Sequence, residues 1–176
     1  MDTKALYRLS YGMFVVCSKK GDKFNGQIAN TVFQITSEPL TVAVSINRNN
    51  LTHSYISESK VFTASVLGSG TPLPFIGGFG FRSGRDVNKL EKVNNKIGKT
   101  GVPIILDNTV AYIEARVVKQ LDVGTHTVFV GEVVDAEIIN EKEECMTYAY
   151  YQQVKRGTTP AAAPTFIPEN SEVKQA

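Results

Sequence analysis

The chain has 176 residues, of which 42% are hydrophobic and 20% charged, and these values indicate one domain with a sizeable core. A formal net charge of +2 and scattered basic residues argue against a general nucleic-acid binder. Two cysteines without a CxxC pair imply neither a disulfide framework nor a zinc site, and reduced thiols are typical of a cytoplasmic protein.

The beginning of the chain leads into no long apolar run, so no signal peptide is expected. No stretch approaches the ~18 apolar residues that a membrane-spanning helix requires. We therefore expect a protein that has no membrane partner.

The first half of the chain predicts mainly strands. Runs rich in Val, Ile, Phe and Thr predict strands over residues 12–18, 27–36, 40–46 and 61–67. A break is expected at Ser37-Glu38-Pro39, because proline lacks the backbone N–H that a strand ladder needs. Thr52 is expected to be the N-cap of a short helix over residues 52–59.

The segment from Gly68 to Gly84 differs from the rest, since it holds six glycines and two prolines together with large apolar residues, among them Phe75, Ile76, Phe79 and Phe81. A glycine-rich apolar loop of this length predicts a cover over a ligand or a contact with a second subunit. The alternative is that these phenylalanines belong to the core. After it, residues 86–93 predict a short helix capped by Asp86.

The last third predicts two long strands, residues 109–120 and 125–139, joined by a turn at residues 121–124. From Tyr148 the chain is rich in Pro, Ala and Thr, which predicts an extended segment, and residues 169–176 are expected to be mobile. Six or more strands with two short helices favour an all-β dominated fold, a closed antiparallel barrel.

The familiar catalytic motifs are not found in the sequence. There are only two histidines, His53 and His126, and neither a Gly-x-Ser-x-Gly turn nor a cluster of metal ligands accompanies them. The glycine run 77–80 lacks the Lys-Ser/Thr ending of a phosphate-binding P-loop. What remains is an organic cofactor, held by many weak polar contacts, that carries the chemistry itself.

Several short motifs, taken in order, support that interpretation. They are Tyr11-Gly12, Asn25-Gly26, Asn30-Thr31, Glu38-Pro39, Ser45-Ile46-Asn47, Thr52-His53, Ser83-Gly84-Arg85-Asp86 and the strand 126–133. Their order and spacing resemble the flavin reductase-like family of the FMN-binding split barrel. The ending Tyr150-Tyr151, Lys155-Arg156-Gly157 and Ala163-Pro164-Thr165 resembles the branch of that family found in high-molecular-weight rubredoxins and archaeal ferric reductases.

The resemblance implies an antiparallel split β-barrel over residues 1–166, followed by a flexible C-terminal tail over residues 167–176. It implies a homodimer that binds FMN noncovalently and takes hydride from NADH or NADPH. Electrons then pass to free flavin, ferric chelates, rubredoxin or oxygen, so rubredoxin or another redox protein is an expected partner.

The resemblance also assigns roles to residues. His126 is implied to be catalytic, near the open flavin face where the nicotinamide stacks. Residues 30–32 are implied to meet the ring edge, residues 45–47 to run beside the ribityl chain, and residues near the start of the predicted helix to take the phosphate. The full set implied to bind the cofactor is Gln27, Ala29, Asn30, Thr31, Val32, Ser45, Ile46, Asn47, Asn50, Thr52, His53, Ser83, Gly84, Arg85 and Lys89.

Each role has a simpler alternative. Asn30 and Thr31 are also typical of an ordinary turn, and Arg85 of a solvated ion pair. His53 fits a surface position, and His126 a core or edge position with its hydrogen bonds satisfied. Two other functions also stay open: an FMN-binding electron carrier resembling flavoredoxin, which has no nicotinamide site, and a barrel that binds no ligand and serves as an interaction module.

Overall fold

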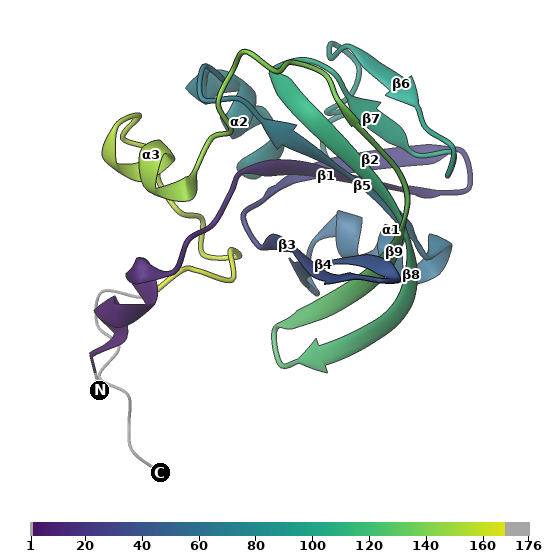
Figure 1. The fold of residues 1–176 in the computed structure, drawn as a ribbon, viewed down its shortest axis with the longest axis horizontal. Coiled ribbons are helices and arrows are strands. Elements are labelled where there is room, and N and C mark those ends of the chain that lie inside the picture. The colour runs from purple at the N-terminus through teal and green to yellow at the C-terminus, as the bar shows by residue number, and fades with distance from the viewer. Residues whose placement is uncertain (1, 168–176) are drawn as a thin grey trace.

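The protein, a computed structural model that describes residues 2–167, is dominated by one curved sheet (Figure 1). Its seven antiparallel strands run in the order β2-β1-β5-β8-β9-β4-β3. Their bounds are β1 Phe14–Lys20, β2 Lys23–Ala29, β3 Val32–Ser37, β4 Leu40–Asn47, β5 Val61–Leu67, β8 Thr109–Val123 and β9 His126–Ile138.

The connection between β2 and β3 shows that this sheet closes into a barrel. The two strands lie at opposite ends of the strand order, yet only Asn30 and Thr31 separate them. A two-residue link spans about 11 Å at most, whereas seven strands laid flat put their outer members about 29 Å apart. The sheet therefore curls until its ends meet, and Ser45 N donates to Thr31 O at 3.2 Å. The predicted all-β dominated split barrel is confirmed.

Short elements cover the barrel. The helices are η1 Thr3–Arg8, α1 Leu51–Ser59, α2 Leu73–Gly80 and α3 Tyr148–Gln153, and strands β6 Asn95–Ile97 and β7 Pro103–Ile105 form a separate pair. No helix within residues 2–167 has the length and apolar character needed to cross a membrane.

Two groups of buried side chains hold these layers together. The barrel interior is filled by residues such as Val44, Ile46, Phe62 and Phe129, which are fully buried. The second group lies under α2 and α3 and includes Met13, Leu67, Ile76, Phe79 and Met146. Because the second group packs beside β1, it fixes α2 and α3 at one end of the barrel, where the candidate site lies.

Several predicted elements are corrected by the structure. Residues 27–36 form two strands instead of one, because β2 pairs with β1 whereas β3 pairs with β4, and the corner lies at Asn30-Thr31. The hairpin of β8 and β9 turns at Gly124-Thr125, later than predicted; Gly124 has a φ of +68°, which glycine adopts without strain. The β6–β7 pair was not predicted at all.

The helices differ from the sequence prediction as well. The glycine-rich segment contains α2, since Pro72 and Pro74 suit a helix start and burial of Ile76 and Phe79 outweighs poor helix propensity. Residues 86–93 form turns instead of a helix, with Leu90 N donating to Asn88 Oδ1 at 3.1 Å.

Near the C-terminus, the segment from Tyr148 begins as α3 and not as an extended chain, because Thr147 Oγ1 caps it by accepting from Tyr150 N. Both Tyr148 and Tyr151 are buried under this helix. The predicted mobile residues 169–176 lie outside the described part of the chain.

Candidate functional site

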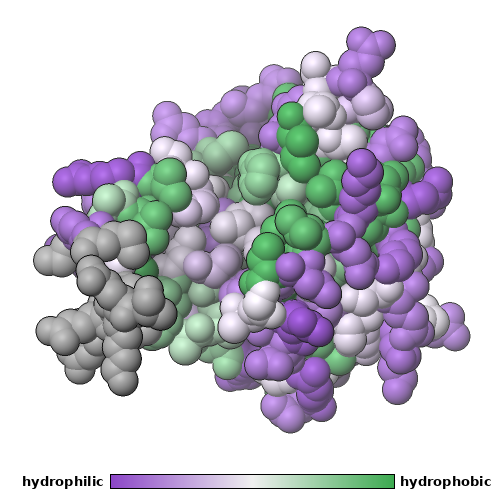
Figure 2. Space-filling model, turned by 90° about the horizontal axis from the view of Figure 1, so that it is seen from below, coloured by the Kyte–Doolittle hydropathy of each residue, from purple (hydrophilic) through white to green (hydrophobic). Residues whose placement is uncertain are grey.

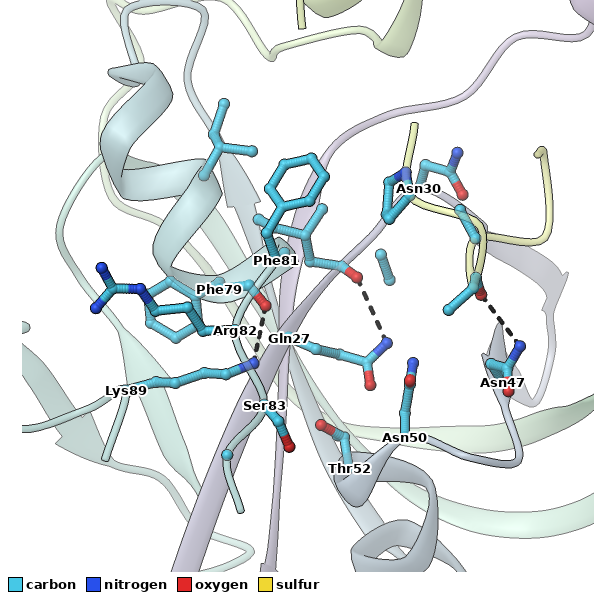
Figure 3. Close-up of a pocket in the computed structure, with 18 of the residues that line it drawn as sticks. Gln27, Asn30, Asn47, Asn50, Thr52, Phe79, Phe81, Arg82, Ser83 and Lys89 are labelled. Carbon is cyan, nitrogen blue, oxygen red and sulfur yellow. Dashed lines mark hydrogen bonds between the residues drawn. The ribbon is translucent and has the colours of Figure 1, made fainter. Parts of the chain in front are cut away.

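A cavity of about 300 Å³ lies where β2 and β4 end, α1 begins and α2 ends (Figure 3). Its remaining wall is the C-terminal segment after α3, which returns to this end of the barrel (Figure 1). The cavity therefore draws on chain segments that are far apart in sequence and that only the closed barrel brings together.

Most of the residues expected to bind a cofactor line this cavity. They are Gln27, Ala29, Asn30, Ser45, Asn47, Asn50, Thr52, Ser83, Gly84, Arg85 and Lys89. The first seven come from β2, β4, the β2–β3 corner and the start of α1 with its N-cap Asn50, and the loop after α2 supplies the last four. Their convergence supports the cofactor interpretation of the polar segments in β2, β4 and α1.

Four other expected residues do not line it: Thr31, Val32, Ile46 and His53. Ile46 points into the barrel core, because successive side chains of a strand face opposite sides and its neighbours Ser45 and Asn47 face the cavity. Val32 packs against the same core.

Thr31 and His53 are turned to other partners. Thr31 Oγ1 donates to Ser45 O at 3.3 Å. His53 Nε2 lies 2.8 Å from Thr127 Oγ1, and its ring packs against Phe129 with 5.2 Å between ring centroids. Burial and the nearby Arg48 lower the pKa of His53, so a charged imidazolium is disfavoured there.

Thr52 is not the N-cap that the sequence predicted. Asn50 is the N-cap of α1, and Thr52 lies within the first turn, fully buried. Its hydroxyl oxygen accepts a hydrogen bond of 2.7 Å from Asn25 Nδ2. The side chain of Asn50 makes no capping bond, so the first amides of α1 have no side-chain partner at the positive end of the helix.

One end of the cavity is cationic. Arg82, Arg85 and Lys89 line it, and the cavity has no Asp or Glu among its described lining residues. Lys89 Nζ donates to Gly26 O at 3.0 Å and to Phe79 O at 2.9 Å. Burial lowers the pKa of Lys89 to about 8, because these carbonyls only partly replace the water that a charged ammonium loses.

The cavity also holds buried acceptors without partners. Within residues 2–167, Gln27 Oε1 and Asn30 Oδ1 are buried side-chain atoms with no hydrogen bond. A buried acceptor left unpaired costs about 1–3 kcal/mol. Since both side chains line the cavity, a ligand N–H or O–H that enters it can satisfy them.

His126, the expected catalytic residue, lies beside the cavity and does not line it. The residue is 9% exposed, its Nδ1 lies 2.8 Å from Thr125 Oγ1, and its Nε2 lies 3.2 Å from Ala162 O. A carbonyl oxygen only accepts, so Nε2 carries a proton. The two contacts fix the orientation of the ring.

The set of residues expected to bind the cofactor left out part of the lining. The omitted residues are Met13, Asn25, Ile28, Leu51, Ile76, Phe79, Gly80, Phe81, Arg82, Tyr148, Tyr151, Thr158, Pro160, Ala162, Ala163 and Pro164. Of these, residues 76 and 79–82 belong to the glycine-rich segment that was expected to cover a ligand or to contact a second subunit. Asn25 was detectable, because it precedes Gln27 and Ala29 by the two-residue period that places side chains on one face of a strand. The C-terminal residues carried no such pattern.

Comparisons with known proteins find similar sequences over most of the chain. Residues 6–159 match the family model described as flavin reductase like domain. The chain is 55% identical to a high molecular weight rubredoxin of Moorella thermoacetica over 94% of this chain and 72% of that one. It is 50% identical to a ferric-chelate reductase (NAD(P)H) of Archaeoglobus fulgidus over 95% of this chain and 98% of that one.

Solved structures share the fold at lower sequence identity. An NADH:FAD oxidoreductase of Streptomyces globisporus superimposes with a TM-score of 0.74 at 23% identity, covering 82% of this chain and 84% of that chain. An FMN-binding protein of Thermus thermophilus gives a TM-score of 0.73 at 25% identity, covering 81% and 83%. The first of these comparisons supports the barrel fold alone.

Proposed function

Because the chain belongs to the flavin reductase-like family, we propose that it is an oxidoreductase that binds FMN noncovalently and takes hydride from NADH or NADPH. One observation carries this proposal: a single cavity is lined by three cations, by no described carboxylate, and by two buried acceptors without partners. A phosphate on a polar tail matches the cations, and a flat ring that has an N–H donor matches a buried acceptor.

The lining residues offer groups that suit each part of FMN. Lys89, Arg82 and Arg85 suit the phosphate, together with the open amides at the start of α1. Asn47 and Asn50 offer amide groups for the ribityl hydroxyls. Asn30 offers a buried acceptor to the ring N–H.

When bound, FMN supplies the redox chemistry, accepting hydride from a nicotinamide and releasing electrons to an acceptor. The protein aligns the ring and shields it from water. Phe79 and Ile76 are buried against the cavity and supply its apolar side. His126 holds a proton at Nε2 beside the cavity. Once Ala162 O moves away, a bound nicotinamide can accept a hydrogen bond from this N–H.

The acceptor is proposed from the chemistry of the relatives. Their names point to ferric chelates and to rubredoxin, and free flavin or oxygen are further candidates. A separate redox protein such as rubredoxin is the proposed macromolecular partner. We also propose a cytoplasmic location, because Cys17 and Cys145 are both free thiols.

A second candidate function is an FMN-binding electron carrier that has no nicotinamide site. The C-terminal segment favours it, because Ala162 O accepts the hydrogen bond from His126 Nε2, and the nicotinamide is expected to bind beside His126. Under this alternative, a protein partner reduces the bound flavin.

The two functions predict different results when NADH or NADPH is added anaerobically to FMN-loaded protein. We expect rapid bleaching of the flavin absorbance with at least one of them, measured by stopped flow. Bound flavin that stays oxidised with both would favour the electron carrier. Failure of the protein to bind FMN at all would rule out both functions.

We further propose that the functional unit is a homodimer. Large apolar side chains are exposed on the barrel strands, among them Phe33 at 56%, Leu121 at 62% and Val123 at 50%. Figure 2 shows apolar groups gathered among hydrophilic ones on the face seen from below. Exposed apolar patches of this kind are typical of subunit interfaces.

Replacing Phe33 by aspartate tests the homodimer. A charge inside an apolar interface is desolvated without a partner, so Phe33→Asp is expected to shift the protein from twice the chain mass to the chain mass in sedimentation. Ile97→Asp is the matched control, because Ile97 is equally exposed at 56% but lies on the separate strand β6. A wild type that sediments as a monomer would contradict the proposal.

A further inference from the structure

The segment after α3 divides into a fixed part and a lightly held part. In the fixed part, Gly157 N donates to Tyr151 O at 2.9 Å, Tyr151 OH donates to Thr158 O at 3.0 Å, and Gln152 Nε2 donates to Thr159 Oγ1 at 3.0 Å. We call the remainder, residues 160–166, the strap. It crosses the cavity, and Pro160, Ala162, Ala163 and Pro164 form part of the cavity lining.

Three hydrogen bonds join the strap to the rest of the barrel: two come from cavity-lining residues, Asn30 and Asn47, and one comes from His126 beside the cavity. Asn30 Nδ2 donates to Thr165 Oγ1 at 2.7 Å. Ala162 O accepts from Asn47 Nδ2 at 3.3 Å and from His126 Nε2 at 3.2 Å. Figure 3 shows Asn47 reaching this segment from the end of β4.

The strap therefore occupies groups that a ligand needs. His126 has one N–H at Nε2, and a ligand that accepts this proton must take the place of Ala162 O. Competition of this kind makes the strap and the ligand mutually exclusive at His126. At Asn30 there is no such conflict, because Nδ2 has a second proton and Oδ1 is unpaired.

The size of the cavity leads to the same conclusion. About 300 Å³ is at the lower end of the range for a pocket that holds one small molecule. A reaction between a flavin and a nicotinamide needs two ring systems stacked in the same space. With the strap in place the cavity is small for two stacked ring systems.

The strap is also easy to displace. Ala161, Ala162, Pro164 and Phe166 are exposed, so the strap buries little apolar surface. Segments with few buried contacts open at low cost in free energy.

From these contacts we propose that the strap occupies the nicotinamide subsite and is displaced by the donor, whereas FMN binds beneath it. This inference rests on the proposed function. It adds that residues 160–166 hold the second-substrate position closed until a nicotinamide arrives, so that the bound flavin is shielded from other oxidants and reductants between turnovers.

Hydrogen exchange measured by mass spectrometry tests the proposal in the full chain loaded with FMN. NAD⁺ and NADP⁺ serve as probes, because neither reduces the flavin. Saturation with the one that binds is expected to raise exchange in residues 160–166 at least threefold, while residues 157–159 stay unchanged. Unchanged or slower exchange in the strap, or binding of neither probe, would overturn the proposal.

Thr165→Val gives an independent measurement. It removes the acceptor for Asn30 with little change in volume, and it is expected to raise strap exchange and to lower the KM for NADH or NADPH roughly two- to tenfold, with FMN affinity unchanged. Thr158→Val is the control, because its hydroxyl has no hydrogen bond to a described residue and it is expected to leave strap exchange unaltered.

A KM that stays the same or rises in Thr165→Val would contradict the proposal that the strap occupies the nicotinamide subsite. If NADH bleaches the flavin while strap exchange stays constant, the proposed function stands, and the proposal that the nicotinamide displaces the strap is wrong. If neither nicotinamide reduces the flavin, the proposed function fails, and the strap proposal fails with it unless NAD⁺ or NADP⁺ still raises exchange in residues 160–166.

Discussion

Lys89→Met is expected to weaken FMN binding by about 10- to 100-fold at pH 7, the loss of one charge-assisted hydrogen bond to a phosphate. The ammonium group of Lys89 has three protons, of which Gly26 O and Phe79 O take two, and the third is left for the cavity. Methionine retains the length of the side chain but provides no proton. Titration of FMN into the apoprotein, followed by flavin fluorescence, gives the ratio of dissociation constants.

Riboflavin provides the control within the same experiment, because it has the ring and ribityl chain of FMN but no phosphate. Its affinity is expected to change less than threefold in Lys89→Met. An equal loss for FMN and riboflavin would mean that Lys89 supports the cavity through its carbonyl contacts instead of binding the phosphate. Unchanged affinity for both FMN and riboflavin would mean that the phosphate does not bind beside Lys89.

The pH dependence follows from the lowered pKa of Lys89, which is about 8 in the free protein. Above that pH the amine is neutral, so binding of a phosphate dianion must take up a proton. FMN affinity is therefore expected to fall above pH 8, by up to about tenfold per pH unit. Below about pH 6 the phosphate itself gains a proton, and affinity falls again. Lys89→Met is expected to remove only the fall in affinity above pH 8.

The barrel was predictable from sequence because its strands carry their own signal. β4 is a near-continuous apolar run, and β8 and β9 alternate between apolar and polar residues. The corner at Asn30-Thr31 was missed although Asn30 is typical of a turn, because β-forming residues resume directly after it and only a change of pairing partner divides β2 from β3. The same limit applies to α2, where tertiary burial of Ile76 and Phe79 decides the conformation.

The candidate site was predictable to the extent that it is built from side chains on regular elements. Resemblance and the strand period together lead to Gln27, Ala29 and Asn47. The strap was not predictable, because its contact with His126 uses a backbone carbonyl, and a carbonyl at Ala162 leaves no trace in the identity of the residue. Arg82 was missed for a related reason, since its place in the cavity depends on where α2 ends.

Gly84→Ala is expected to weaken FMN binding by about 10- to 100-fold through a steric effect on the cationic loop, residues 82–85. A Cβ on Gly84 would overlap Asn25 Oδ1 and would approach Leu51 Cδ2 at 3.2 Å. Asn25 is buried, and its rotation would break its bond to Thr52 Oγ1, so the loop must move instead. Overpacking of this kind typically costs about 1–3 kcal/mol. Because the overlap displaces Arg82, Ser83 and Arg85, we expect the binding free energy of the FMN phosphate to weaken by a similar amount.

Two further variants separate this steric mechanism from a general effect of alanine. Gly78→Ala adds the same methyl group to α2, where nothing lies within 4 Å, and is expected to leave FMN affinity within twofold of the wild type. Gly84→Ala combined with Asn25→Ala removes the overlapping atom, so the double variant is expected to bind FMN more tightly than Gly84→Ala alone, although each single change weakens binding. Purely additive losses in that cycle would show that Asn25 and Gly84 act separately. The recovery would show that the contact between a buried amide of β2 and one glycine holds the cationic loop over the start of α1, which is the geometry on which the phosphate site depends.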